Sequence, residues 1–203
     1  MADEVWDPSI FALMLLLRLT TPLQGASPRE LILEACRRNN TSLLEDVIAS
    51  LSHSSPSSPE VFVAKTLNEA QDGIGNGVLH IAASYGSYEV LDVLLDQAGL
   101  EIDGFDRMER DTPLHKAVRF VNGLERGEWE AGAAIVEILL DAGCDPRLRN
   151  KAKLRPLDLV DPRNTELRAI LQKAEFAIAA GDDMVNEDEE EENGAAGSAS
   201  DSD

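Results

Sequence analysis

The chain has 203 residues, which fits one ordinary domain and is short for two. Apolar residues make up 43% of it but aromatic residues only 4%, so its core must consist mainly of Leu, Ile, Val and Ala. Such a core favours packed helices over a β-sandwich. The formal net charge of −20 argues against a general nucleic-acid binder. Two cysteines are too few for a disulfide framework or a four-cysteine zinc site.

Residues 1–27 are expected to form an N-terminal extension with a short apolar helix. Its apolar run is Ile10–Leu17, which is too short to cross a membrane, because a spanning helix needs about 20 residues. The run has the length of a signal-peptide core, but acids (Asp3, Glu4 and Asp7) precede it where a secretory signal carries bases. The pattern therefore favours a helix that is buried or bound by a partner, with secretion as the weaker alternative.

Two stretches in the middle of the chain resemble each other. Leu79–Gly86 reads Leu-His-Ile-Ala-Ala-Ser-Tyr-Gly, and Thr112–Val118 reads Thr-Pro-Leu-His-Lys-Ala-Val. Each precedes a second helical pattern, which ends at Leu94–Leu95 in one copy and at Leu139–Leu140 in the other. The Thr-Pro-Leu-His-x-Ala signature is typical of ankyrin repeats, so this part of the chain resembles that family. The residues expected in the core are Leu79, Ala82, Leu94, Leu114, Ala117 and Leu139.

Two weaker copies flank this pair. Upstream, Ile32–Ile48 repeats the apolar pattern of Leu79–Leu95, and downstream Arg155–Val160 replaces the signature. The copies are further apart than the ankyrin period of about 33 residues, which predicts a Ser/Pro-rich loop near Ser52–Pro59 and an insertion at Asn122–Gly132. The resemblance implies an all-α ankyrin solenoid of about four repeats, built from helix-turn-helix units with β-hairpin-like fingers. The repeat domain is predicted at residues 28–180, with repeats near 28–51, 72–103, 106–145 and 150–175.

The composition changes at about Gly181. The last 22 residues contain 10 acids and no base. No apolar face there could offset the entropy of ordering the chain, so residues 181–203 are predicted to be a disordered acidic tail. The tail either keeps the protein soluble or acts as a polyanion that attracts a basic client. Its like-charge block consists of Glu187, Asp188, Glu189, Glu190, Glu191 and Glu192.

No group of residues in the sequence predicts an enzyme, a metal site or a cofactor. His80 and His115 occupy the same position in two repeats, where the resemblance implies hydrogen bonds to neighbouring turns. His53 has no acidic or thiol neighbour at ligand spacing, and a zinc site needs three or four ligands. Cys36 is expected on the buried face of the first repeat, and Cys144 has no histidine nearby to activate it. A non-enzymatic protein without a cofactor is therefore expected.

One basic region stands out in this acidic chain. Residues 145–173 hold eight bases and four acids, and five of the bases alternate through the connection between the third and fourth repeats. They form either a solvated loop neutralised by nearby acids or an electrostatic contact for a partner. Two further residues are candidates. One is an arginine at a position where a turn glycine is usual. The other is a tryptophan in the second insertion, which either contributes to binding or folds back over the helices of its own repeat. The predicted partner-binding residues are Arg110, Trp129, Arg147, Arg149, Lys151, Lys153 and Arg155.

The overall plan also resembles the fungal ankyrin-repeat chaperones that protect a newly made small-subunit ribosomal protein. The resemblance rests on chain length, on Leu33–Arg37 in the first repeat, on Asp145–Lys151 and on the acidic C-terminus. It implies an escort in ribosome biogenesis, monomeric before it binds a basic client through the concave ankyrin surface and acidic tail. Such an escort would act in the cytoplasm and nucleus, without direct nucleic-acid or membrane contact.

Two other functions stay open at this point. The first alternative is an ankyrin adaptor or scaffold for a signalling or transcription partner, in which the tail is only a solubility element. A more distant one is a histone-type or nucleic-acid-mimic binder led by the tail.

Overall fold

The computed structural model describes residues 25–55 and 57–190, with side chains up to Ala180. In this part of the chain every regular element is helical, and one isolated β-bridge pairs Gln71 with Gly77. The helices are α2 (Pro28–Arg38), α3 (Thr41–Ser54), α4 (Pro59–Glu69), α5 (Val78–Tyr85), α6 (Tyr88–Leu95), α7 (Pro113–Gly123), α8 (Trp129–Asp141), α9 (Pro156–Leu159) and α10 (Thr165–Glu190). The expected all-α fold class is confirmed.

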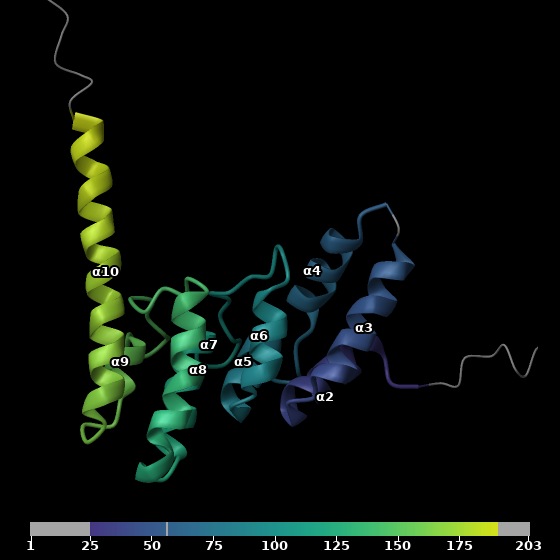
Figure 1. Ribbon diagram of the computed structural model, residues 1–203, viewed down its shortest axis with the longest axis horizontal. Coiled ribbons are helices and arrows are strands. Elements are labelled where there is room, and N and C mark those ends of the chain that lie inside the picture. The colour runs from purple at the N-terminus through teal and green to yellow at the C-terminus, as the bar shows by residue number, and fades with distance from the viewer. Residues whose placement is uncertain (1–24, 56, 191–203) are drawn as a thin grey trace, which may run out of the picture.

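The helices form an elongated stack of pairs that follow one another in chain order (Figure 1). The first helices of successive pairs pack on one another, α2 on α5, α5 on α7 and α7 on α9. These are called the inner helices. The second helices, α3, α6, α8 and α10, make a parallel row of contacts and are called the outer helices. Each pair thus buries its apolar residues against its neighbours, as expected for a solenoid.

Local sequence explains why α7 starts where it does. The Thr112 hydroxyl accepts a hydrogen bond from the backbone N–H of His115, which satisfies one of the free donors at the helix start. Pro113 follows at the first helical position, where its missing N–H costs nothing. The signature that identified this repeat is therefore a helix-start signal. Leu114 and Ala117 then point inward and are fully buried.

A continuous core runs along the stack. Its largest fully buried apolar side chains include Ile32, Leu44, Leu91, Leu114 and Leu171, which come from every part of the repeat domain. The six residues expected in the core from the sequence are all buried, which confirms the register of the central repeats. They are Leu79, Ala82, Leu94, Leu114, Ala117 and Leu139.

The two signature histidines link neighbouring repeats, as expected from the resemblance. Nε2 of His80 lies 3.0 Å from the carbonyl oxygen of Asp111, and Nε2 of His115 lies 3.0 Å from that of Leu154. Burial lowers the pKa of both histidines, so both rings are neutral at pH 7. A carbonyl only accepts, so Nε2 carries the hydrogen in each ring. The structural interpretation of the histidines is confirmed.

The insertion after the first repeat contains a helix that the sequence pattern did not predict. The Ser/Pro-rich loop predicted near Ser52–Pro59 is shorter than expected, because α3 continues to Ser54 and α4 begins at Pro59. Proline favours the first position of a helix, so the Ser-Pro boundary starts α4 rather than continuing a loop. Val63 and Leu67 of α4 are buried, and the helix packs on α3.

The second insertion is also largely helical. In it α7 extends to Gly123, a 3₁₀ turn covers Arg126–Glu128, and α8 starts at Trp129. At the other end, α10 continues past Gly181, where the tail was predicted to begin. Residues 181–190 contain one glycine and no proline, and an isolated glycine costs only about 1 kcal/mol in a helix. The run Ile10–Leu17 and the tail residues 191–203 lie outside the described residues.

Candidate partner-binding surfaces

Tight turns connect the helix pairs and project from the stack as fingers. The first finger comprises residues 71–77, the second 104–112 and the third 144–155. Each is closed by a backbone hydrogen bond: Asp72 N–H to Asn76 (2.9 Å), Asp106 N–H to Asp111 (3.0 Å) and Asn150 N–H to Leu154 (3.0 Å). The N–H of Lys151 also donates to the carbonyl of Glu109 at 2.8 Å, so the second and third fingers lie against each other.

Two of the predicted partner-binding residues occupy strained backbone positions in the fingers. Gly75 takes the left-handed conformation in the first finger (φ 89°), whereas Arg110 (φ 53°) and Lys153 (φ 62°) take it in the second and third. This confirms that Arg110 stands where a turn glycine is usual. Its guanidinium lies 4.7 Å from the centre of the Phe105 ring, a contact that offsets part of the strain.

Replacing Lys153 by glycine is expected to raise the free energy of unfolding by about 0.5–1 kcal/mol. The left-handed backbone strains any residue with a Cβ, and relief of that strain outweighs the greater freedom of glycine in the unfolded chain. Urea denaturation would measure the change. The matched control is Lys151→Gly, which removes the same charge from an exposed position without a left-handed backbone and is expected to destabilise. If the two substitutions changed the free energy of unfolding equally, backbone strain at Lys153 would be contradicted.

Each finger exposes a large apolar side chain. Ile74 is 57% exposed in the first finger and Met108 is 56% exposed in the second, while Leu154 in the third is exposed to a lesser degree. Phe105 in the second finger is also exposed. We call these four residues the fingertip ridge. Exposed apolar side chains that follow one another along a surface are typical of a protein interaction site.

The basic residues of the third finger divide into two groups. Arg147 lies 3.0 Å from Asp145, and Arg155 pairs with Asp158 and Glu175, so local acids neutralise both. The other three are exposed beside the fingertip ridge. Arg149 donates to the Lys153 carbonyl at 2.7 Å and lies 4.0 Å from the Asp158 carboxylate, and Lys151 donates to the Met108 carbonyl at 3.3 Å.

A buried ion network, which sequence reasoning missed, holds the second finger on α7. Lys116 Nζ lies 2.5 Å from Asp106 and 3.4 Å from Asp111, and Arg119 Nε lies 3.0 Å from Asp111. Asn150 of the third finger donates to the same Asp111 carboxylate at 2.9 Å. Both carboxylates are almost completely buried. One feature of the sequence could have predicted this network. Two bases lie three residues apart on α7, and two acids of the second finger precede them.

Trp129 folds back over its own insertion. It is half-buried at the start of α8 and packs against the core, and its indole N–H donates to the Leu124 carbonyl at 3.2 Å. The guanidinium of Arg126 lies over the ring, 5.6 Å from its centre. The indole thus fixes the connection between α7 and α8.

The same insertion forms one wall of a groove of about 400 Å³ between α6, α7 and α8, which we call the insertion groove. A Cβ at Gly86 would overlap the ring of Phe120, and one at Gly132 would lie 2.5 Å from Cδ1 of Leu124. The two glycines therefore allow Phe120 and Leu124 to line the groove. Its other main lining residues are Tyr88, Glu128, Ala131 and Ile135.

Charges are sorted between the two faces of the stack. Helices α3, α6 and α8 carry no lysine or arginine, and all their acids are exposed: Glu45, Asp46, Glu89, Asp92, Glu130, Glu137 and Asp141. The inner helices α2, α5 and α7 instead carry more bases than acids. Their bases are Arg29, Arg37, Arg38, Lys116 and Arg119. The face formed by the inner helices is therefore not acidic, although the chain as a whole has a net charge of −20.

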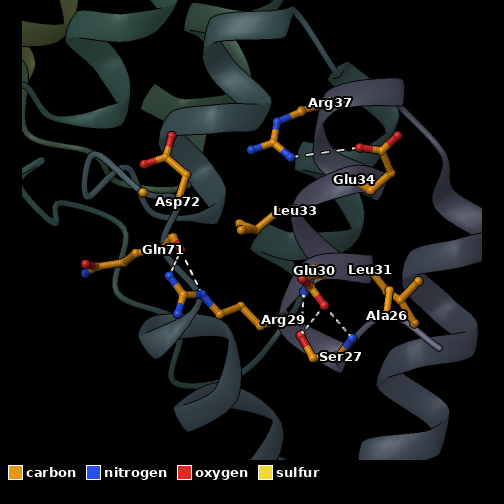
Figure 2. A pocket seen from close by; sticks show the side chains of 11 residues that line it. Ala26, Ser27, Arg29, Glu30, Leu31, Leu33, Glu34, Arg37, Gln71 and Asp72 are labelled. Carbon is orange, nitrogen blue, oxygen red and sulfur yellow. Dashed lines mark hydrogen bonds and ion pairs between the residues drawn. The ribbon is translucent and has the colours of Figure 1, made fainter. Parts of the chain in front are cut away.

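A second groove, of about 590 Å³, lies at the N-terminal end of the stack between α2 and the first finger. Figure 2 shows Arg29 extended from α2 toward Gln71, whose carbonyl accepts its Nε–H at 2.8 Å. The Glu30 carboxylate accepts from the N–H and hydroxyl of Ser27, which caps α2. The charged groups of this groove thus have partners within its own walls.

The described residues form no group of three His, Cys, Asp or Glu side chains placed to hold a metal ion. Cys36 and Cys144 are buried, and burial raises the pKa of both thiols, that of Cys36 to about 12. Both are therefore thiols at neutral pH and poor nucleophiles. Among the helices described, none has the length and apolar character needed to span a membrane.

Comparisons with known proteins identify the family. Residues 31–150 match the model for ankyrin repeats in three copies. The "Ankyrin repeat-containing protein YGL242C" of Saccharomyces cerevisiae is 44% identical over 171 residues, which cover 82% of this chain and 90% of the yeast protein. The name of the yeast protein mentions ankyrin repeats and gives no binding partner. The chain belongs to the ankyrin-repeat family, and its stacked repeats make it a protein-binding module.

Proposed function

We propose that this protein is a non-enzymatic escort that binds a basic protein client on the outer helices α3, α6 and α8. The observation that carries the proposal is the set of exposed acids on α3, α6 and α8, with no base on these helices. Such a one-signed surface attracts a basic partner from solution and raises its association rate. The acids of the C-terminal segment add to the net negative charge that would attract such a partner.

The proposal moves the client from the concave surface, where the sequence had suggested it, to the outer face. Exposed bases on the fingers would repel a basic client there, whereas the outer helices α3, α6 and α8 carry acids and no lysine or arginine. The client class follows the resemblance in sequence, which implies a newly made small-subunit ribosomal protein. Escorting such a client would require a monomer that acts in the cytoplasm and the nucleus.

Reversing charge on the outer face is expected to slow association with a basic probe. The variant Glu89→Lys/Asp92→Lys/Glu137→Lys should lower the on-rate for a labelled 16-residue peptide of alternating lysine and leucine about tenfold at low salt. Stopped-flow fluorescence at two salt concentrations would measure it. The control, Glu60→Lys/Glu101→Lys/Glu166→Lys, makes the same change in net charge at exposed acids outside α3, α6 and α8. Equal slowing in both variants would mean that net charge matters and the outer face does not.

A second candidate, an adaptor for an acidic partner, is favoured by the fingertip ridge. Ile74, Met108 and Leu154 are exposed beside bases such as Arg107 and Lys151. That combination fits an acidic segment with apolar side chains. A peptide of alternating glutamate and leucine that binds the wild type and loses binding with Met108→Glu would favour the adaptor over the escort.

A further inference from the structure

We propose that the insertion groove binds a large apolar side chain from a basic segment of the client. The inference rests on the proposed escort function and adds to it a specific anchor point. The groove lies at the end of the helices opposite the fingers, since it is lined by residues after α5 and around the α7–α8 connection. It therefore differs from the fingertip ridge in position and in charge.

The groove has the shape and lining of an apolar binding site. Its volume of about 400 Å³ falls within the usual range for ligand pockets, about 300–1,000 Å³. Phe120, Leu124 and Ile135 supply apolar surface from two helices and their connection. Tyr88 stays 42% exposed at the edge, where further burial by a partner would be favourable. An apolar side chain that enters would bury surface now open to water.

The groove is formed before any partner arrives. The insertion lengthens α7, and the indole hydrogen bond from Trp129 to Leu124 fixes the turn that follows. Gly86 and Gly132 allow the aromatic and aliphatic walls to approach closely. A preformed site loses little conformational entropy on binding, which favours affinity.

The charges around the groove specify a basic partner. Glu128 lines it, and Glu130 is exposed two residues further along, on α8. The nearby base, Arg126, lies over the Trp129 ring. A segment with a leucine or phenylalanine between lysines or arginines fits this arrangement of apolar floor and acidic rim. A polyphosphate such as RNA does not, because the rim would repel it.

The experiment fills the groove without adding charge or apolar surface. Ala131 is exposed in α8 at the groove, and Ala131→Gln places a neutral polar side chain there. The matched control is Ala49→Gln, at an exposed alanine of the outer helix α3. The probes are the lysine-leucine peptide and a lysine-serine peptide of the same length and charge. Fluorescence anisotropy would give the dissociation constants, and thermal melts would show that both variants stay folded.

The lysine-leucine peptide is expected to bind Ala131→Gln about tenfold more weakly than wild type and Ala49→Gln, and Tyr88→Ala should show a loss of the same kind. The lysine-serine peptide should bind weakly and equally to all of them. If all variants bound the lysine-leucine peptide equally, the proposal that the insertion groove binds the client would be overturned, and the escort function would stand. No binding of either peptide to the wild type would overturn both. The inference would also be overturned if a 16-nucleotide single-stranded RNA bound the wild type and did not bind the Ala131→Gln variant.

Discussion

Replacing Leu114 by alanine is expected to lower the free energy of unfolding by about 2–5 kcal/mol. Leu114 is fully buried in α7, the inner helix that contacts α5, α8 and α9. The substitution removes apolar contacts and leaves a cavity between repeats that helices on three sides prevent from closing. Equilibrium urea denaturation followed by circular dichroism would measure the loss.

The control for this prediction is an exposed apolar residue. Val61 on α4 is 70% exposed, so Val61→Ala should change the free energy of unfolding by no more than about 0.5 kcal/mol. A Leu114→Ala variant as stable as wild type would contradict the central place of α7 in the core.

The second large effect is expected at Asp111. The Asp111→Ala variant should lose about 3 kcal/mol of stability at pH 7, because it removes a buried carboxylate that holds Asn150 and Arg119, while Lys116 keeps only Asp106. Asp111 accepts hydrogen bonds from Asn150 and Arg119 and lies near Lys116, so the substitution loosens two fingers and α7 together. The exposed Asp92→Ala variant, which removes an equal charge, should change stability little.

The effect of Asp111 should depend on pH. Burial alone would raise the pKa of its carboxyl group, but the bonds from Asn150, Arg119 and Lys116 outweigh burial and hold the pKa below its usual value. The stability contributed by a lowered pKa is complete above the pKa of the unfolded chain and is lost as pH falls through the folded value. The difference between wild type and Asp111→Ala should therefore be constant from pH 5 to 8 and shrink below about pH 4. A difference that grows in acid would contradict this account.

Local signals in the sequence made the central repeats predictable. Thr112 and Pro113 start α7, and the position shared by His80 and His115 fixes the register between repeats, so the core residues followed directly. The helix α4 was not predictable in the same way. Its buried residues span only Val63 to Leu67, too short a pattern to outweigh the serines and prolines before it.

The candidate surfaces depended on contacts between distant parts of the chain. The insertion groove requires Phe120 to lie against Gly86, and the ion network requires Asn150 to reach Asp111. No spacing in the sequence predicts such pairs. The difference in charge between inner and outer helices can be found from the sequence once the helices are assigned. The net charge does not reveal this difference, because it is a sum over both faces.

The helix α4 also changes how the stack can come apart. A solenoid normally frays from its ends, because a terminal repeat has only one neighbour. Here Asn68 of α4 donates to the Gly99 carbonyl at 3.0 Å and accepts from the Glu101 N–H at 2.9 Å, both in the connection after α6. Since α4 also packs on α3, the first repeat cannot open without disturbing the second. We therefore expect the amides of α2 and α3 to exchange in the same cooperative unit as those of α5 and α6.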